Sequence, residues 1–306
     1  MKGTFCFLAA LALSAVIHSG AFAQQDIDKI IKGLDSDQES EVFLALRSLQ
    51  TQTKNAEKAI PSLVTHLESR NPRLVVEAAI ALLRIDKDYS DRVVTRMLTD
   101  PKVSAYASRL WVTHPVLTLG PLTEACANPA TESTALAGLQ MSLQVVRSKP
   151  FAKTPEYTKQ AEITAARLLA IVEDEDSVLA SRMLAAAMFS ELSPSDAFRT
   201  LPVVLDSIAS SANSRFTSAA ILRPVMDDVT PILLDEFKSH PWPSSAATSL
   251  AYILATNHAS SYPFIVEAAS SPDVAVRYGC ALTFGQPAIA NYRQSTTTPV
   301  LTALMH

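Results

Sequence analysis

The side chains that most often ligate metals or catalyse proton transfer are widely scattered in this 306-residue chain. No two histidines are four residues apart, as the pair in a helical zinc site would be. There is no His-Glu-x-x-His, Gly-x-Ser-x-Gly or glycine-rich phosphate-loop motif, and seven glycines leave little material for such loops. We therefore predict a protein that is not an enzyme, with no catalytic residues, no cofactor and no metal.

Two acidic segments offer oxygen ligands for a cation. One contains Asp86, Asp88 and Asp91, and the other spans residues 173–176. Calcium binding is possible, but neither segment has the glycine turn and the distal glutamate of a known calcium loop. Carboxylates also stabilise the N-terminal ends of helices. We favour this capping role and keep calcium binding as the alternative.

A second kind of chemistry is recognition of a partner by basic and aromatic side chains. Residues 70–109 carry eight basic and five acidic side chains. Arg92 and Arg96 share a helix face because they are four residues apart. An exposed tryptophan beside an arginine, as Trp111 is beside Arg109, is a common binding anchor. The alternatives are a solvated face and a tryptophan in the core. The predicted partner-binding residues are Arg73, Arg84, Arg92, Arg96, Arg109 and Trp111.

Helices are the elements that must position these residues. In residues 56–69, apolar side chains recur at i, i+3, i+4 and i+7, which predicts one helix with a single buried face. Asn71 and Pro72 then end it and begin a second helix that reaches Ile85. A proline followed by an apolar run also returns along the chain, mostly at one or two periods of about thirty residues, which indicates a repeat architecture. These prolines are Pro61, Pro121, Pro202, Pro231 and Pro263.

Residues 59–82 resemble a HEAT repeat, with a proline in the first helix, a turn at Asn71-Pro72 and an alanine-rich second helix. Residues 271–282 are more similar still, since they keep the turn aspartate and the Val-Arg pair that opens the second helix. The resemblance implies an all-α protein, an α-α superhelix (solenoid) over residues 24–286 with second helices on its concave face. We place about eight helix pairs, at residues 26–50, 54–86, 89–114, 115–146, 155–190, 195–226, 227–257 and 259–286.

The expected solenoid also bears on a loop, the C-terminal segment and two cysteines. Residues 147–155 form a proline-flanked basic loop, which is either a hinge or an inserted contact loop. Residues 287–306 are predicted to cap the last apolar face. Cys126 and Cys280 lie about four repeats apart, too far for a disulfide if neighbouring helix layers are roughly 8–10 Å apart. We therefore predict that both are free, buried thiols.

Residues 1–23 have the features of a secretory signal peptide. Lys2 precedes an apolar run from Phe5 to Ile17, and Ala21 and Ala23 form a small-x-small cleavage site. The run is too short for a membrane-spanning helix, which needs about 20 residues. An uncleaved N-terminal anchor is the alternative. We expect a periplasmic or secreted protein with no stable membrane insertion after cleavage.

The charge that remains after cleavage bears on the partner. The mature chain has 25 basic and 30 acidic side chains, a formal charge of −5, with no basic block. This argues against nucleic acid and against a HEAT-like glycosylase. We predict an exported, non-enzymatic repeat scaffold that binds a protein or peptide along its concave surface. The alternative is an extracytoplasmic α/α-toroid-type hydrolase or lyase, which would need clustered carboxylates or histidines in one cavity.

Overall fold

The computed structural model describes residues 27–51, 55–148, 154–210, 215–239, 243–257, 266–272 and 274–284. In this part of the chain all regular structure is helical, as the composition predicts. None of the helices there is long and apolar enough to cross a membrane. The predicted signal peptide and C-terminal cap lie outside the described residues, as does Pro263.

The chain forms two compact units, Met1–Pro121 and Leu122–His306. Their boundary falls inside helix α9 (Pro115–Ala125), before the predicted hinge at residues 147–155. Of that predicted loop, residues 149–153 are outside the described part of the chain. Arg147 at its start forms an ion pair with Glu191.

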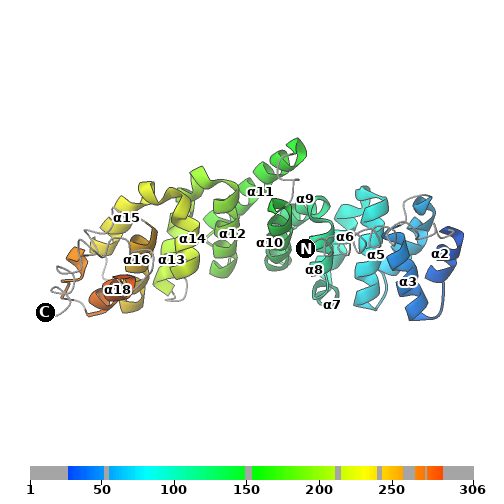
Figure 1. Ribbon diagram of the computed structural model, residues 1–306, viewed down its shortest axis with the longest axis horizontal. Coiled ribbons are helices and arrows are strands. Elements are labelled where there is room, and N and C mark those ends of the chain that lie inside the picture. Colours follow the sequence, from blue (N-terminus) through cyan, green and yellow to red (C-terminus); the bar gives the residue numbers. More distant parts are fainter. Residues whose placement is uncertain are drawn as a thin grey trace, which may run out of the picture. The chain divides into compact units, whose positions relative to one another are not determined.

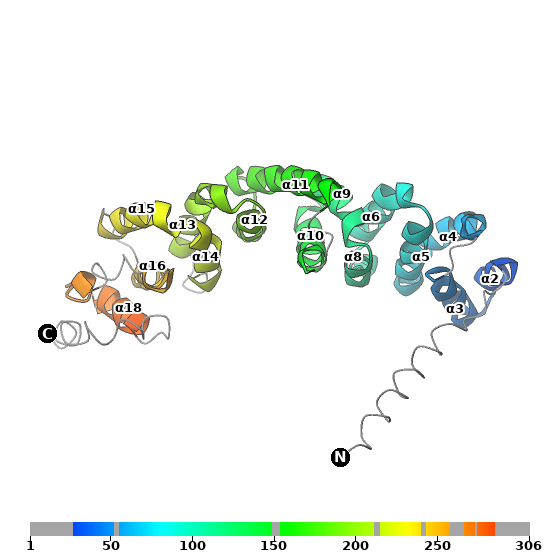
Figure 2. The same cartoon turned by 45° about the horizontal axis from the view of Figure 1, so that its top comes forward.

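Unit 1 is built around helix α5, which packs against α3, α4, α6, α7 and α8. In Figure 2, α3, α5 and α8 form the lower row of this unit, and α4 and α6 lie above them. Its helices are α2 (Ile27–Leu34), α3 (Glu39–Leu49), η1 (Ala56–Ala59), α4 (Ile60–Leu67), α5 (Pro72–Ile85), η2 (Lys87–Tyr89), α6 (Ser90–Thr99), α7 (Pro101–Ser104) and α8 (Ser108–Thr113).

In unit 2, each helix packs mainly against the next helix in the chain or against the one after that (Figure 1). Helix α12 contacts α10, α11, α13 and α14, and α16 contacts α13, α14, α15 and α18. The helices are α10 (Glu132–Arg147), α11 (Pro155–Glu173), α12 (Leu179–Leu192), η4 (Pro194–Thr200), α13 (Leu201–Ser210), α14 (Arg215–Leu222), η6 (Arg223–Val225), α15 (Met226–Ser239), α16 (Ser244–Asn257) and α18 (Val274–Phe284).

Local sequence explains where two of the unit 1 helices, α5 and α7, begin. Asn71 caps α5 by accepting a hydrogen bond from the backbone N–H of Arg73 (2.9 Å), and Pro72 follows where no N–H is needed. Asp100 caps α7 in the same way, and another proline follows it. The prediction of one continuous helix over residues 56–69 is wrong at its start. A 3₁₀ helix ends at Ala59, and α4 begins at Ile60 with a proline in its first turn.

Small side chains set the close packing of unit 1. Ten consecutive residues of α5, from Leu74 to Leu83, are buried, and three of them are alanines. A Cβ atom added to Gly33 would lie only 3.1 Å from the Cβ of Ala45, so α2 and α3 also approach closely. In unit 2, Cys126 and Cys280 are free and buried, as predicted. Burial raises the pKa of each thiol to about 12.

Candidate partner-binding site

The exposed charged side chains of helices α5, α7 and α8 in unit 1 are all basic. Helices α5, α7 and α8 carry the basic side chains Arg73, Arg84, Lys102 and Arg109, and all four are exposed. Their one acidic side chain, Glu77, is only 4% exposed. These helices therefore present positive charge to the solvent and keep their negative charge inside.

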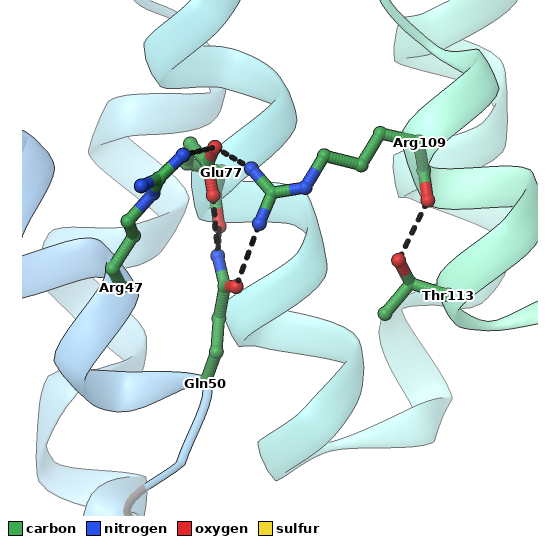
Figure 3. Close-up of polar contacts among 5 residues, drawn as sticks. All are labelled: Arg47, Gln50, Glu77, Arg109 and Thr113. Atoms are coloured by element: carbon green, nitrogen blue, oxygen red, sulfur yellow. Dashed lines mark hydrogen bonds and ion pairs between the residues drawn. The ribbon is translucent and has the colours of Figure 1, made fainter.

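Helix geometry places three of the charges of α5 in one stripe. Residues four and eleven positions apart differ by only about 40° and 20° around a helix axis. Arg73, Glu77 and Arg84 thus lie along the same side of α5. Arg47 of α3 and Arg109 of α8 reach Glu77 from the two neighbouring helices (Figure 3). We call the surface formed by Arg47, Arg73, Arg84 and Arg109 the basic face.

Glu77 is the centre of a polar cluster that joins three helices. Its Oε1 atom forms ion pairs with Arg109 and, at 3.8 Å, with Arg47. Its Oε2 atom accepts a hydrogen bond of 2.6 Å from Nε2 of Gln50, which follows α3. The amide oxygen of Gln50 in turn accepts a hydrogen bond from Nη2 of Arg109 (3.3 Å). Thr113 donates to the backbone oxygen of Arg109 one turn earlier, as Figure 3 shows.

The two arginines are held differently. The side chain of Arg47 is 55% exposed, and its guanidinium stacks on the Phe43 ring, 4.5 Å from the centroid. Arg109 is 43% exposed and donates hydrogen bonds to Glu77 and Gln50. Partial burial, and secondarily the positive charge of Arg47, lower the pKa of Arg109, which remains protonated at neutral pH. The two positive charges therefore repel one another across Glu77.

Apolar side chains flank the cluster on the helices that carry the arginines. Leu44 lies one turn before Arg47 on α3 and is 65% exposed. Val112 lies one turn after Arg109 on α8 and is 48% exposed. Tyr106 is also exposed, and the guanidinium of Arg73 lies over its ring at 5.8 Å. The basic face is therefore amphipathic, a combination typical of surfaces that bind peptides.

The structure separates the residues that the sequence predicts to bind a partner. Arg92 and Arg96 belong to α6, in the other row of helices. Arg92 pairs with Glu68 at 3.2 Å. Arg96 donates to the backbone oxygen of Leu67 and pairs with Asp100, both at 3.0 Å. These two arginines join α6 to residues that precede and follow it, away from the helices that carry Arg73, Arg84 and Arg109.

Trp111 is not an exposed anchor. It is 4% exposed and belongs to the core of unit 1, as do Val103 and Leu110. The interpretation as an exposed binding residue is wrong, and the alternative of a core tryptophan is right. The candidate binding role stands for Arg73, Arg84 and Arg109. The site also contains three residues that the sequence analysis did not predict, namely Arg47, Gln50 and Glu77. The intervals of 27 residues from Gln50 to Glu77 and of 32 from Glu77 to Arg109 are close to the period of about thirty residues that the prolines predict.

The acidic segments form local turns. The Asp86 carboxylate accepts from the backbone N–H of Asp88 (2.9 Å) and caps the 3₁₀ helix that follows. Asp174 accepts from the N–H of Asp176 (3.1 Å) and from the Ser177 hydroxyl (2.9 Å). The predicted capping is wrong for the α-helices that follow, because α6 and α12 have Tyr89 and Val178 at their N-cap positions and neither makes a side-chain capping hydrogen bond. Among the described residues, no three His, Cys, Asp or Glu side chains are grouped to hold a metal ion.

Unit 2 contains a cavity of about 280 Å³ beside the buried Cys126. The Arg167 side chain and several carboxylates line it, but Glu132 and Asp174 both accept hydrogen bonds from the hydroxyl of Ser177. Asp174 thus belongs to the turn between α11 and α12, and Glu132, the first residue of α10, is bound to the same turn through Ser177. The Cys126 thiol has a pKa raised to about 12 by burial and is not a nucleophile at neutral pH.

Comparison with known proteins gives no further constraint on the site, because the chain matches no protein-family model, no curated protein and no solved structure.

Proposed function

We propose that this protein is an exported, non-enzymatic scaffold, a HEAT-like α-solenoid of about eight helix pairs that binds a protein or peptide partner along its second helices. In unit 1 these second helices are α3, α5 and the α7–α8 segment. The observation that carries the proposal is the amphipathic basic face on them, where exposed arginines lie beside exposed apolar side chains.

The repeat is supported by the order of the helices. Pro61, Pro121, Pro202 and Pro231 each fall in the helix that precedes a helix rich in small residues. In unit 1 the successive second helices contact one another, since α5 packs against both α3 and α8. Contacts limited to near neighbours are what stacked repeats make.

Export is supported by the signal-peptide features of residues 1–23, and a periplasmic or secreted location follows from them. A protein or peptide is favoured over nucleic acid because the mature chain carries a formal charge of −5. Sequencing of the mature N-terminus tests export directly. We expect it to begin at Gln24, and a chain that begins at Met1 in the exported fraction would contradict cleavage.

Site-specific photo-cross-linking tests partner binding. A photoreactive phenylalanine analogue replaces Val112 on α8, and a matched variant carries it at the exposed Thr65 on α4. In the exported fraction, the residue 112 probe should form an adduct with a defined protein and the residue 65 probe should not. The partner, once purified, should bind Val112→Asp about tenfold more weakly than wild type. No adduct at residue 112, or equal adducts at both positions, would refute binding by this face.

A further inference from the structure

We propose that Arg47 and Arg109 form a receptor for the side-chain carboxylate of an acidic peptide segment in the partner, which joins Glu77 between the two guanidiniums. This inference rests on the proposed function, because it identifies which chemistry the basic face recognises. The occupant to which we commit is an aspartate or glutamate with apolar neighbours in the sequence of an exported protein.

The first argument is local charge. Two guanidinium groups face one carboxylate, so the cluster has one positive charge in excess. The other ion pairs among the described residues join one base to one acid, as in Arg92–Glu68 and Arg182–Asp206. Glu77 is thus the one acid in that part of the chain with two arginine partners. A second carboxylate would make the cluster neutral and relieve the repulsion between Arg47 and Arg109.

The second argument is the supply of hydrogen-bond donors. Both carboxylate oxygens of Glu77 are already used, Oε1 by the arginines and Oε2 by Gln50. The closest approach of Arg47 to Glu77, 3.8 Å, is beyond the length of a hydrogen bond. A guanidinium has five N–H donors in a planar fork that fits a carboxylate. The half-exposed Arg47 therefore retains donors that an incoming carboxylate can use.

The third argument is that the arginines are held in place before a partner arrives. The Phe43 ring supports the guanidinium of Arg47, and Glu77 and Gln50 fix that of Arg109 from below the surface. Side chains that are already ordered lose little entropy when they bind. Since Arg47 and Arg109 contact the same oxygen of Glu77, one partner carboxylate can approach both (Figure 3).

The fourth argument distinguishes a peptide from a simple anion. The exposed Leu44 and Val112 lie one helical turn from the two arginines, on α3 and α8 respectively. An apolar side chain on either side of an aspartate or glutamate can cover them. Inorganic anions and a bare lipid headgroup offer no such apolar groups. A peptide can contact both the arginines and the exposed apolar side chains.

Binding to matched peptide pools tests the inference on the full mature chain. Each pool contains acetylated and amidated twelve-residue peptides with a fixed apolar-x-Glu-x-apolar core and random flanks, and the control pool has Gln in place of Glu. We expect wild type to retain the Glu pool at least about tenfold more strongly than the Gln pool, as for one charge-assisted contact. Arg47→Gln should lose this preference. Arg92→Gln, which removes an equally exposed charge from α6, should keep it.

Folding and other ligands are controlled separately. Arg109→Gln should also lose the preference, but it removes a partner of buried Glu77, so Arg47→Gln with an unchanged melting curve is the decisive variant. Equal retention of the two pools, no retention of either, or a preference that survives in Arg47→Gln would overturn the carboxylate receptor. Stronger retention of Gln peptides with a free C-terminus, or of phosphatidylglycerol vesicles, would also overturn it. The cross-linking result at residue 112 still decides the proposed function in each case.

Discussion

Glu77→Gln should destabilise unit 1 more than the loss of the exposed charge of Arg47 would. The carboxylate is 4% exposed and receives a 2.6 Å hydrogen bond from Gln50 in addition to its ion pairs with Arg47 and Arg109. A hydrogen bond to a charged group contributes about 1.5–3 kcal/mol. The arginines are about half exposed, so water compensates part of the loss. We expect a reduction of about 2 kcal/mol in the free energy of unfolding.

Substitution of the two arginine partners of Glu77 should lower the free energy of unfolding by different amounts. Arg47→Gln should cost about 0.5 kcal/mol or less, because Arg47 is 55% exposed and lies at 3.8 Å. Arg109→Gln should cost about 2 kcal/mol, since it leaves a buried carboxylate with only Gln50 and a distant arginine. A double-mutant cycle should give a coupling of about 1–2 kcal/mol for Glu77 with Arg109, and much less for Glu77 with Arg47.

Tryptophan fluorescence can isolate the response of unit 1. The chain has two tryptophans, and Trp111 is buried in unit 1. In a background in which Trp242 is replaced by phenylalanine, urea unfolding followed by Trp111 emission reports this unit alone. The reasoning is refuted if Glu77→Gln costs no more than Arg47→Gln. It is also refuted if the Glu77 and Arg109 substitutions are additive, because the cluster would then not act as a unit.

Three further predictions concern the core, the thiols and pH. Leu63→Asp and Leu82→Asp should each unfold unit 1 in the Trp111 assay, because a buried unpaired charge costs several kcal/mol. The control is Val112→Asp at an exposed position, which should change the free energy of unfolding by less than about 0.5 kcal/mol. Cys126 and Cys280, with pKa values of about 12, should react with Ellman's reagent at pH 8 only after denaturation; reaction in the native state would contradict their burial. Burial lowers the pKa of His114 in the folded protein, so as the pH falls this imidazole is protonated in the unfolded chain before it is protonated in the folded one. Unit 1 should therefore lose stability as pH falls below about 6.5. His114→Gln should reduce this loss relative to wild type, and an unchanged pH profile would contradict it.

Much of the helical framework of unit 1 was predictable because local rules determine it. The Asn71 cap, Pro72 after it and the apolar spacing up to Ile85 define α5 without knowledge of any other helix. That both cysteines are free and buried was also predicted, from their wide separation in the expected helix array and their apolar neighbours in the sequence. The start of α4 was missed because a 3₁₀ turn has nearly the same apolar spacing as an α-helix.

The site was harder to predict because its residues come from separate helices. Glu77 lies in a run of ten buried residues, and this was the available signal, since a glutamate is almost never buried without a partner. Its partners are 27 to 32 residues away and meet it only after α3, α5 and α8 have packed. Trp111 entered the list of candidate binding residues because of its charged neighbour Arg109, although a core position was the alternative. Its spacing from Val103 and Ala107, at i, i+4 and i+8, already indicated the buried stripe.

The Glu77 cluster links the stability of unit 1 to the proposed recognition of a carboxylate. A buried carboxylate must be compensated, and here the compensation comes from arginines on the two helices adjacent to α5. One arginine would have sufficed for neutrality, as it does for Glu68 or Asp206. The second arginine therefore adds little to folding, because it is half exposed and beyond hydrogen-bonding distance. A side chain that contributes little to stability while it increases an unfavourable local charge is best explained by a contact that only a partner completes.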